Sequence, residues 1–210
     1  MTITLHQGDL PAGLSFGTSV ALDTESLGLS ARRDRLCLVQ LSAGDGDAHL
    51  VQFRRDDYAA PNLQALLANP AVTKLFHFAR ADLVMLRHYL GVMPAPVYCT
   101  KIASAIARTF TERHGLKDLT RDLIGVDLSK EQQTSDWGTE TLTSDQQNYA
   151  ASDVLYLHRL REKLDKMLER EGRLALALDC MRFLPTRAEL DLAGWEDVDI
   201  FAHRPTARPG

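Results

Sequence analysis

The order of short apolar runs along the chain constrains its fold more than any other feature. Five runs have the composition of β-strands: residues 19–25, 36–41, 49–53, 72–76 and 97–99. The first three follow one another, and the glycines of Gly44-Asp45-Gly46-Asp47 favour a hairpin between the second and the third. The last two alternate with segments of helical spacing. This order predicts an α/β fold with a mixed sheet, antiparallel on one side and parallel where helices form the crossovers.

Four segments have the apolar spacing of α-helices: residues 61–67, 81–90, 101–113 and 143–170. The last is the clearest, because Thr143 and Gln146 have the spacing of a capping box, in which side chains satisfy free amides of the first turn. We expect a folded domain over residues 1–175. We expect residues 176–210 to form a C-terminal extension, helical at first, that is not an independent domain and ends in a loose tail over residues 202–210.

Length and composition fit a single soluble domain. A chain of 210 residues can bury a sizeable core, and no stretch approaches the roughly 20 apolar residues of a membrane span. The N-terminal residues lack the features of a secretory signal. Cys37, Cys99 and Cys180 are widely spaced without a C-x-x-C motif, so neither a disulfide framework nor a zinc finger is indicated. We therefore expect a cytoplasmic protein. The net charge of −4 does not decide on nucleic acid, since cations bound to carboxylates offset it.

Acidic residues lie at three places where predicted elements begin or end. Asp23 and Glu25 are two apart at the end of a strand, so both point to one face. Asp82 lies where a strand gives way to a helix, and Tyr149 and Asp153 are four apart on one face of the capped helix. Each has an ordinary explanation when taken alone: a polar strand end, an acidic first helical turn, or chance spacing.

Together the four carboxylates indicate a metal site. Carboxylates buried side by side repel one another, and such a cluster persists when cations neutralise it. Ligation by oxygen alone suits Mg²⁺ or Mn²⁺. Two such ions about 3.5–4 Å apart are a known device for displacement at a phosphodiester.

The same residues resemble a known family. The three motifs of the DEDD exonuclease superfamily are similar to residues 21–29 (ALDTESLGL), 77–83 (HFARADL) and 149–154 (YAASDV). A tyrosine four residues before the last aspartate is typical of the DEDDy branch, and within it the chain is most similar to ribonuclease D. Connecting segments agree as well: residues 35–42, 99–104 and 128–137. The resemblance spans roughly residues 15–168.

The resemblance implies a ribonuclease H-like fold and a 3′→5′ exoribonuclease that releases 5′-mononucleotides with two divalent cations, Mg²⁺ or Mn²⁺. It implies that Asp23, Glu25 and Asp153 bind one metal. Asp23 would also contact the second, with Asp82 supporting it. Tyr149 would position the attacking water, because an unperturbed tyrosine, with a pKa near 10, stays protonated at neutral pH.

Substrate contacts follow from the same resemblance. The loop Ser26-Leu27-Gly28-Leu29 would pack against the terminal nucleotide, with Leu27 as a wedge. Among the basic residues between the second and third motifs, most are interpreted as solvated helix faces. Lys101 and Lys130 lie in matching segments, so we expect them to contact phosphate. Trp137 has two interpretations, a core anchor or a base-stacking residue, and both stay open. Phe78 departs from the family, where this position is often small or polar.

Three functions remain to be compared. The leading one is an exoribonuclease acting on single-stranded RNA 3′ ends, such as tRNA precursors or short RNA. A DNA exonuclease with the same mechanism is the alternative, because the carboxylates do not distinguish the two sugars. A non-catalytic nucleic-acid-binding module ranks last, since all four carboxylates and the tyrosine are present. Larger ribonuclease D proteins carry helical HRDC domains, and we expect a short form without one.

Overall fold

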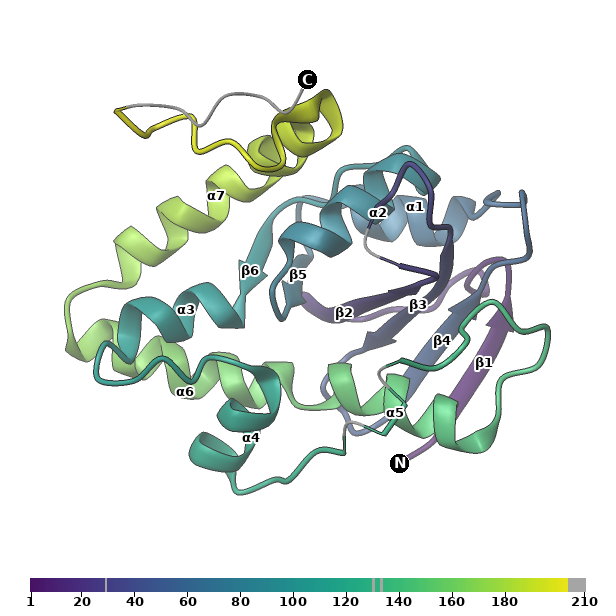
Figure 1. The fold of residues 1–210 in the computed structure, drawn as a ribbon. Coiled ribbons are helices and arrows are strands. Elements are labelled where there is room, and N and C mark those ends of the chain that lie inside the picture. The colour runs from purple at the N-terminus through teal and green to yellow at the C-terminus, as the bar shows by residue number, and fades with distance from the viewer. Residues whose placement is uncertain (29, 130, 133, 204–210) are drawn as a thin grey trace.

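The computed structural model of the protein describes residues 1–28, 30–129, 131–132 and 134–203. Its centre is a six-stranded sheet in the order β1-β4-β3-β2-β5-β6 (Figure 1). The strands are β1 (Ile3–Gln7), β2 (Ser19–Ser26), β3 (Leu36–Ser42), β4 (Ala48–Gln52), β5 (Thr73–Phe76) and β6 (Val97–Cys99). All five predicted strands are confirmed.

The sheet is mixed, as predicted. β2, β3 and β4 form an antiparallel meander, whereas β5 and β6 continue the sheet in parallel beyond β2. β1 was not predicted, and it pairs in parallel with β4 at the opposite edge. β3 is buried along its whole length, because helices or loops cover both faces of the sheet there.

Seven helices are present in the described part of the chain, followed by a kinked π-type turn. They are α1 (Pro61–Ala68), α2 (Arg80–Leu90), α3 (Thr100–Ala107), α4 (Leu116–Ile124), α5 (Ser144–Leu155), α6 (Leu157–Arg170), α7 (Leu174–Leu190) and the turn η1 (Asp191–Trp195). No helix there is long and apolar enough to cross a membrane.

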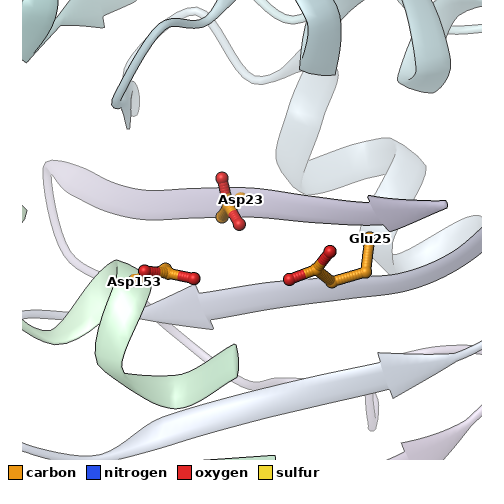
Figure 2. A group of neighbouring side chains, drawn as sticks. All are labelled: Asp23, Glu25 and Asp153. Atoms are coloured by element: carbon orange, nitrogen blue, oxygen red, sulfur yellow. The ribbon is translucent and has the colours of Figure 1, made fainter. Parts of the chain in front are cut away.

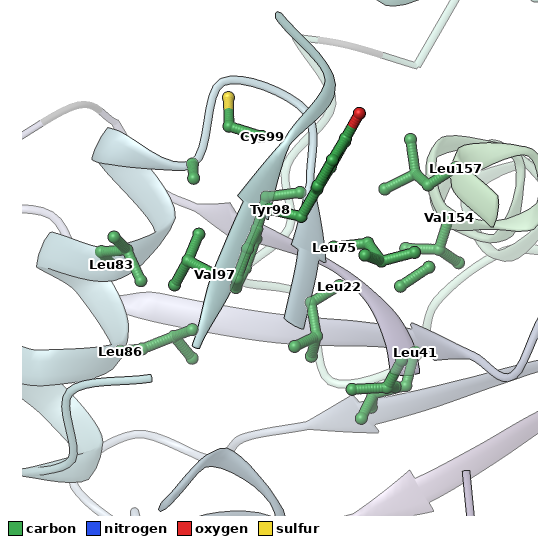
Figure 3. Close-up of a cluster of buried hydrophobic side chains, with 14 of the residues drawn as sticks. Leu22, Leu41, Leu75, Leu83, Leu86, Val97, Tyr98, Cys99, Val154 and Leu157 are labelled. Atoms are coloured by element: carbon green, nitrogen blue, oxygen red, sulfur yellow. The ribbon is translucent and has the colours of Figure 1, made fainter. Parts of the chain in front are cut away.

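Helices pack on both faces of the sheet. α5 lies against β2, β3 and β4, and α2 contacts β2 and β3. Figure 3 shows the resulting core, with Leu83 and Leu86 of α2 beside Val97 and, on the other side, Val154 and Leu157 near Leu75. This packing fixes α2 and α5, the helices that carry Asp82 and Asp153, relative to the end of β2.

The helix predicted over residues 101–113 ends earlier than expected. α3 stops at Ala107, and Arg108 turns inward until its side chain is only 4% exposed. Its guanidinium donates hydrogen bonds to Asp122 Oδ2 (2.8 Å) and to the carbonyl of Arg113 (3.1 Å). The prediction was therefore wrong after residue 107, because a buried arginine holds a loop against α4, a helix that was not predicted.

The helix predicted over residues 143–170 is two helices. The capping box is confirmed: Thr143 Oγ1 accepts from the Gln146 amide, and Gln146 Oε1 accepts from the Thr143 amide. The chain breaks at Tyr156 (φ −110°, ψ −4°) and α6 begins at the next residue. The apolar stripe continues across the break, so spacing alone did not reveal it.

The C-terminal part packs on the rest of the fold. α7 contacts α2, α3, α6 and β6, and it runs along one side of the molecule in Figure 1. The proposed boundary after residue 175 falls in the first turn of α7, and the division into domain and extension stays a prediction. Of the predicted tail, residues 204–210 lie outside the described residues.

Candidate active site

Three carboxylates meet at the end of β2. Asp23 and Glu25 project from one face of the strand, and Asp153 projects from the α5 helix packed on that face. One oxygen of each lies within 4.8 Å of the others. Figure 2 shows the Glu25 and Asp153 carboxylates pointing toward each other with Asp23 beside them. This is the one group of three or more metal-type ligands found among the described residues.

Asp82 reaches the same site from the other face of the sheet. It lies in the first turn of α2, is buried, and accepts a 2.7 Å hydrogen bond at Oδ1 from the Thr24 hydroxyl. Thr24 lies between the two carboxylates of β2, so its side chain points to the opposite face, where α2 packs. Thr24 was not predicted from the sequence, although its position between two acidic strand residues was the available signal.

Burial and mutual repulsion raise the pKa values of the four carboxylates. Burial, followed by the charges of the other three, raises the pKa of Asp23 well above its usual range. Burial and the charges of Asp153 and Asp82 raise the pKa of Glu25 to about 9. Burial raises the pKa values of Asp82 and Asp153 to about 7 each. Four anions at neutral pH are therefore unfavourable without cations, and the all-oxygen donor set fits divalent cations such as Mg²⁺.

Tyr149 lies one helical turn before Asp153 and lines the same cavity. Burial and the charges of Asp153, Glu25 and Asp23 raise its pKa above the usual value. The phenol shares a hydrogen bond with the Asp153 carboxyl. It is therefore protonated at neutral pH and can orient a water molecule by donating or accepting a hydrogen bond.

Gln40 is a further site residue that the sequence analysis missed. It faces Asp23 directly across the β2–β3 ladder, and its Nε2 lies 3.4 Å from Asp23 Oδ2. The side chain is fully buried, and its Oε1 has no hydrogen-bond partner among the described residues. A lone amide in the apolar run LCLVQL was the sequence signal that could have identified it.

The carboxylates line a cavity of about 620 Å³ together with the loop that follows β2. Ser26 Oγ donates to the carbonyl of Gly28 (2.6 Å), and Leu27 is 51% exposed in the cavity. A Cβ on Gly28 would lie 2.3 Å from Asp34 Oδ2, so a side chain at this position would displace the Asp34 carboxylate. Ser26, Leu27 and Gly28 of the loop predicted to contact the terminal nucleotide line the cavity, and Leu29 lies outside the described residues.

The other predicted substrate contacts differ in position. Lys101 lines the cavity, with its Nζ 3.7 Å from the ring centroid of Phe78. Trp137 lines it too but is only 2% exposed, and its ring lies 6.1 Å from that of Tyr149. Its indole N–H has no partner among the described residues. Lys130 lies outside the described residues.

Comparison with known proteins gives the class of this site. The sequence model of a family described as "3'-5' exonuclease" matches residues 9–169. The chain belongs to this 3′-5′ exonuclease family.

Several relatives have solved structures or curated sequences. *Brucella melitensis* NrnC bound to pGG is 53% identical, with a TM-score of 0.94 over 97% of this chain and 100% of that chain. The same protein with bound Mg²⁺ gives a TM-score of 0.93. *Escherichia coli* RNase D is 29% identical, with a TM-score of 0.72 over 86% of this chain and 48% of that chain.

Ribonuclease D of *Acidiphilium cryptum* is 37% identical over 74% of this chain. The chain spans 39% of the length of that protein. The similarity to ribonuclease D and the ribonuclease H-like exonuclease fold expected from the sequence are confirmed.

Proposed function

We propose that the protein is a metal-dependent 3′→5′ exoribonuclease that removes 5′-mononucleotides from RNA 3′ ends. The observation that carries the proposal is the convergence of Asp23, Glu25 and Asp153 within 4.8 Å at the end of β2. Asp82 and Tyr149 line the same cavity, whose volume suits a nucleotide-sized ligand. Membership of the 3′-5′ exonuclease family supports the same reaction.

The proposed metal ligands are the carboxylates of this cavity. Asp23, Glu25 and Asp153, which lie within 4.8 Å of one another, would hold one divalent cation. Asp23 would also contact a second cation, and Asp82 would support that cation through water. Mg²⁺ or Mn²⁺ fits this all-oxygen donor set, and Mg²⁺ is bound in a structure of *Brucella melitensis* NrnC. The chemistry that such cations supply when bound is the acidification of a water molecule and the stabilisation of a leaving oxygen.

The remaining site residues would place the substrate. Tyr149 keeps its proton at neutral pH and orients the attacking water. Lys101 offers a positive charge to phosphate at the cavity wall, and Leu27 projects into the cavity as a wedge against a base. Lys130 and Trp137 complete the proposed contacts. Gln40 and Thr24 hold Asp23 and Asp82 in place.

RNA is the favoured substrate. Brucella melitensis NrnC, which is similar to 97% of this chain, was solved bound to pGG. We therefore place short RNA first among substrates and tRNA precursors second, with single-stranded DNA as the alternative. Such a substrate pool, and the three free cysteines, agree with a cytoplasmic location.

The products test this proposal. Uniformly labelled RNA, as a dinucleotide and as a longer single strand, is incubated with protein and Mg²⁺ or Mn²⁺, and the products are separated by chromatography. Nucleoside 5′-monophosphates are the expected products. Nucleoside 3′-monophosphates, or internal fragments, would contradict the proposed reaction.

A further inference from the structure

Phe78 is an unusual residue in the wall of the carboxylate cavity. It is 50% exposed, although the next residue, Ala79, is fully buried. Among the large apolar side chains that are exposed in the described part of the chain, Leu27 and Phe78 are the two that line this cavity. Exposed aromatic area is unfavourable in water, so a ligand that covered this ring beside the reactive groups would gain binding free energy.

The backbone at Phe78 is strained in a way that turns the ring outward. Its φ is +63°, a left-handed backbone conformation that residues other than glycine rarely adopt. On one side His77 is held by a 2.9 Å hydrogen bond between its Nδ1 and Thr100 Oγ1, and on the other α2 begins with Asp82 in its first turn. Backbone strain of this kind persists where the surrounding structure enforces it, and it concentrates at functional sites.

Lys101 contacts the same ring. Its Nζ lies 3.7 Å from the ring centroid, which is within the range of a cation–π interaction. The ammonium covers one face of the ring and leaves the rest of the half-exposed side chain open. A flat aromatic surface, a cation and a cluster of metal-type ligands thus line one cavity, and these match the base and the phosphate of a nucleotide.

We propose that Phe78 is a base-stacking residue of this cavity, which packs its ring on a nucleobase adjoining the phosphate under attack while Lys101 holds the ring in place. The inference rests on the proposed nuclease function and adds a specificity-determining contact to it. Stacking on an aromatic ring tolerates every base, so this contact would select for the presence of a base and not for its identity.

The test compares matched substitutions at two exposed phenylalanines. Phe78→Leu removes the ring but keeps an apolar side chain, and Phe78→Trp restores an aromatic surface. Phe110→Leu is the control, because Phe110 is 77% exposed, also lies under an arginine (5.8 Å from Arg108 Cζ) and is not among the residues that line the cavity. The substrates are an RNA dinucleotide and two analogues that lack either the terminal or the penultimate base.

Stacking predicts a pattern that general damage would not produce. Phe78→Leu should lower kcat/KM about tenfold on the intact dinucleotide. The difference between Phe78→Leu and the unsubstituted protein should vanish on one of the two abasic analogues, which identifies the stacked base. Phe78→Trp should restore most of the rate, and Phe110→Leu should change nothing. A loss of equal size on all three substrates, or no loss, would overturn the inference.

A fluorescence measurement of binding distinguishes a failure of the stacking inference from a failure of the proposed nuclease function. A dinucleotide containing 2-aminopurine loses fluorescence when the base stacks, whether or not it is cleaved. Quenching by the unsubstituted protein and by Phe78→Trp, with little quenching by Phe78→Leu, supports Phe78 even if no cleavage is seen. Cleavage with unchanged quenching in Phe78→Leu overturns the stacking role and leaves the nuclease proposal standing.

Discussion

The hydroxyl of Thr24 donates a 2.7 Å hydrogen bond to the carboxylate Oδ1 of Asp82, which ties β2 to the first turn of α2. Because Thr24 points to the opposite face from Asp23 and Glu25, this bond brings a carboxylate from the far side of the sheet to the site. The four carboxylates therefore reach the site from both faces of the sheet, at the end of β2.

The Thr24–Asp82 bond can be tested by removing one hydroxyl. Thr24→Val keeps the shape of the side chain but removes the hydroxyl that donates to the buried Asp82 carboxylate, which keeps only backbone donors. Residues that orient a metal ligand typically contribute 10- to 100-fold to affinity or activity, so we expect cleavage to fall about tenfold or more. Thr24→Ser keeps the hydroxyl and should remain close to the unsubstituted rate. Steady-state kinetics with varied Mg²⁺ gives the answer, and equal rates for the two variants would contradict this role.

The raised carboxylate pKa values predict how stability depends on pH without metal. Asp82 and Asp153 titrate at about 7 and Glu25 at about 9 in the folded protein, above the values near 4 of an unfolded chain. The folded state therefore binds more protons, and its stability falls as pH rises from about 4 through 7 to 9. Thermal melts in EDTA should show this decline, with a smaller slope for Glu25→Gln.

Divalent cations should reverse that trend. Metal binding requires ionised carboxylates, so it strengthens over the same pH range and releases protons. Melts with Mg²⁺ should diverge upward from melts in EDTA as pH increases. A metal-free protein whose melting temperature rises steadily between pH 5 and pH 9 would contradict the burial of a repelling cluster.

Tyr149→Phe separates water positioning from metal binding. The phenol keeps its proton at neutral pH, so its loss removes a hydrogen bond to water or to Asp153 but no metal ligand. We expect kcat to fall about 10²-fold or more, in the range of a positioned group in the transition state. Mn²⁺ affinity measured by calorimetry should change little. A marked loss of Mn²⁺ affinity would instead make Tyr149 part of the ligand framework.

The C-terminal part is held to α2 by an ion-pair network centred on the buried Asp191. Asp191 accepts from Arg80 (2.6 and 2.8 Å) and from Arg187 (2.6 and 3.1 Å). Asp191→Ala leaves both guanidinium groups without this partner, so we expect a loss of about 3 kcal/mol in the free energy of unfolding. This loss is an upper estimate, because the Arg80 side chain is 37% exposed and water screens its charge.

A matched control for that network lies two residues before Asp191, at the end of α7. Glu189 pairs with Arg87 in the open, where both side chains are more than 40% exposed. Glu189→Ala should therefore cost about 0.5 kcal/mol or less. Urea unfolding of the two variants measures the difference. Equal losses would mean that burial adds nothing to the Asp191 network.

The sequence predicted the sheet and most helices because their patterns are local. Strand runs and capping residues act within a few positions, and β2 to β6 follow from them. β1 escaped notice because its partner, β4, lies more than 40 residues away and an edge strand needs little apolar content. The break at Tyr156 and the loop held by Arg108 depend on tertiary contacts that periodicity does not record.

The candidate site was likewise predicted only in part from the sequence. Motif residues such as Asp23 and Asp153 could be predicted from spacing and resemblance. Their spacing did not show that the four carboxylates reach the site from both faces of the sheet. Thr24 acts through a hydrogen bond to Asp82 on another element, and Gln40 acts through its pairing with Asp23 on the neighbouring strand. Neither contact can be read from sequence spacing. Phe78 was noted as a departure from the family, but its outward orientation comes from a left-handed backbone that only the structure reveals.

The central claim is metal-dependent removal of nucleotides from the 3′ end, and one digestion tests it most directly. Single-stranded RNA labelled at the 5′ end, with matched DNA alongside, is incubated with Mn²⁺, Mg²⁺ or EDTA and resolved on a gel. Asp23→Ala and Asp153→Ala serve as inactive controls. We predict a ladder that shortens from the 3′ end only with metal, faster for RNA than for DNA. Folded protein that leaves both strands intact, or a ladder that persists in EDTA or in either variant, would contradict the account.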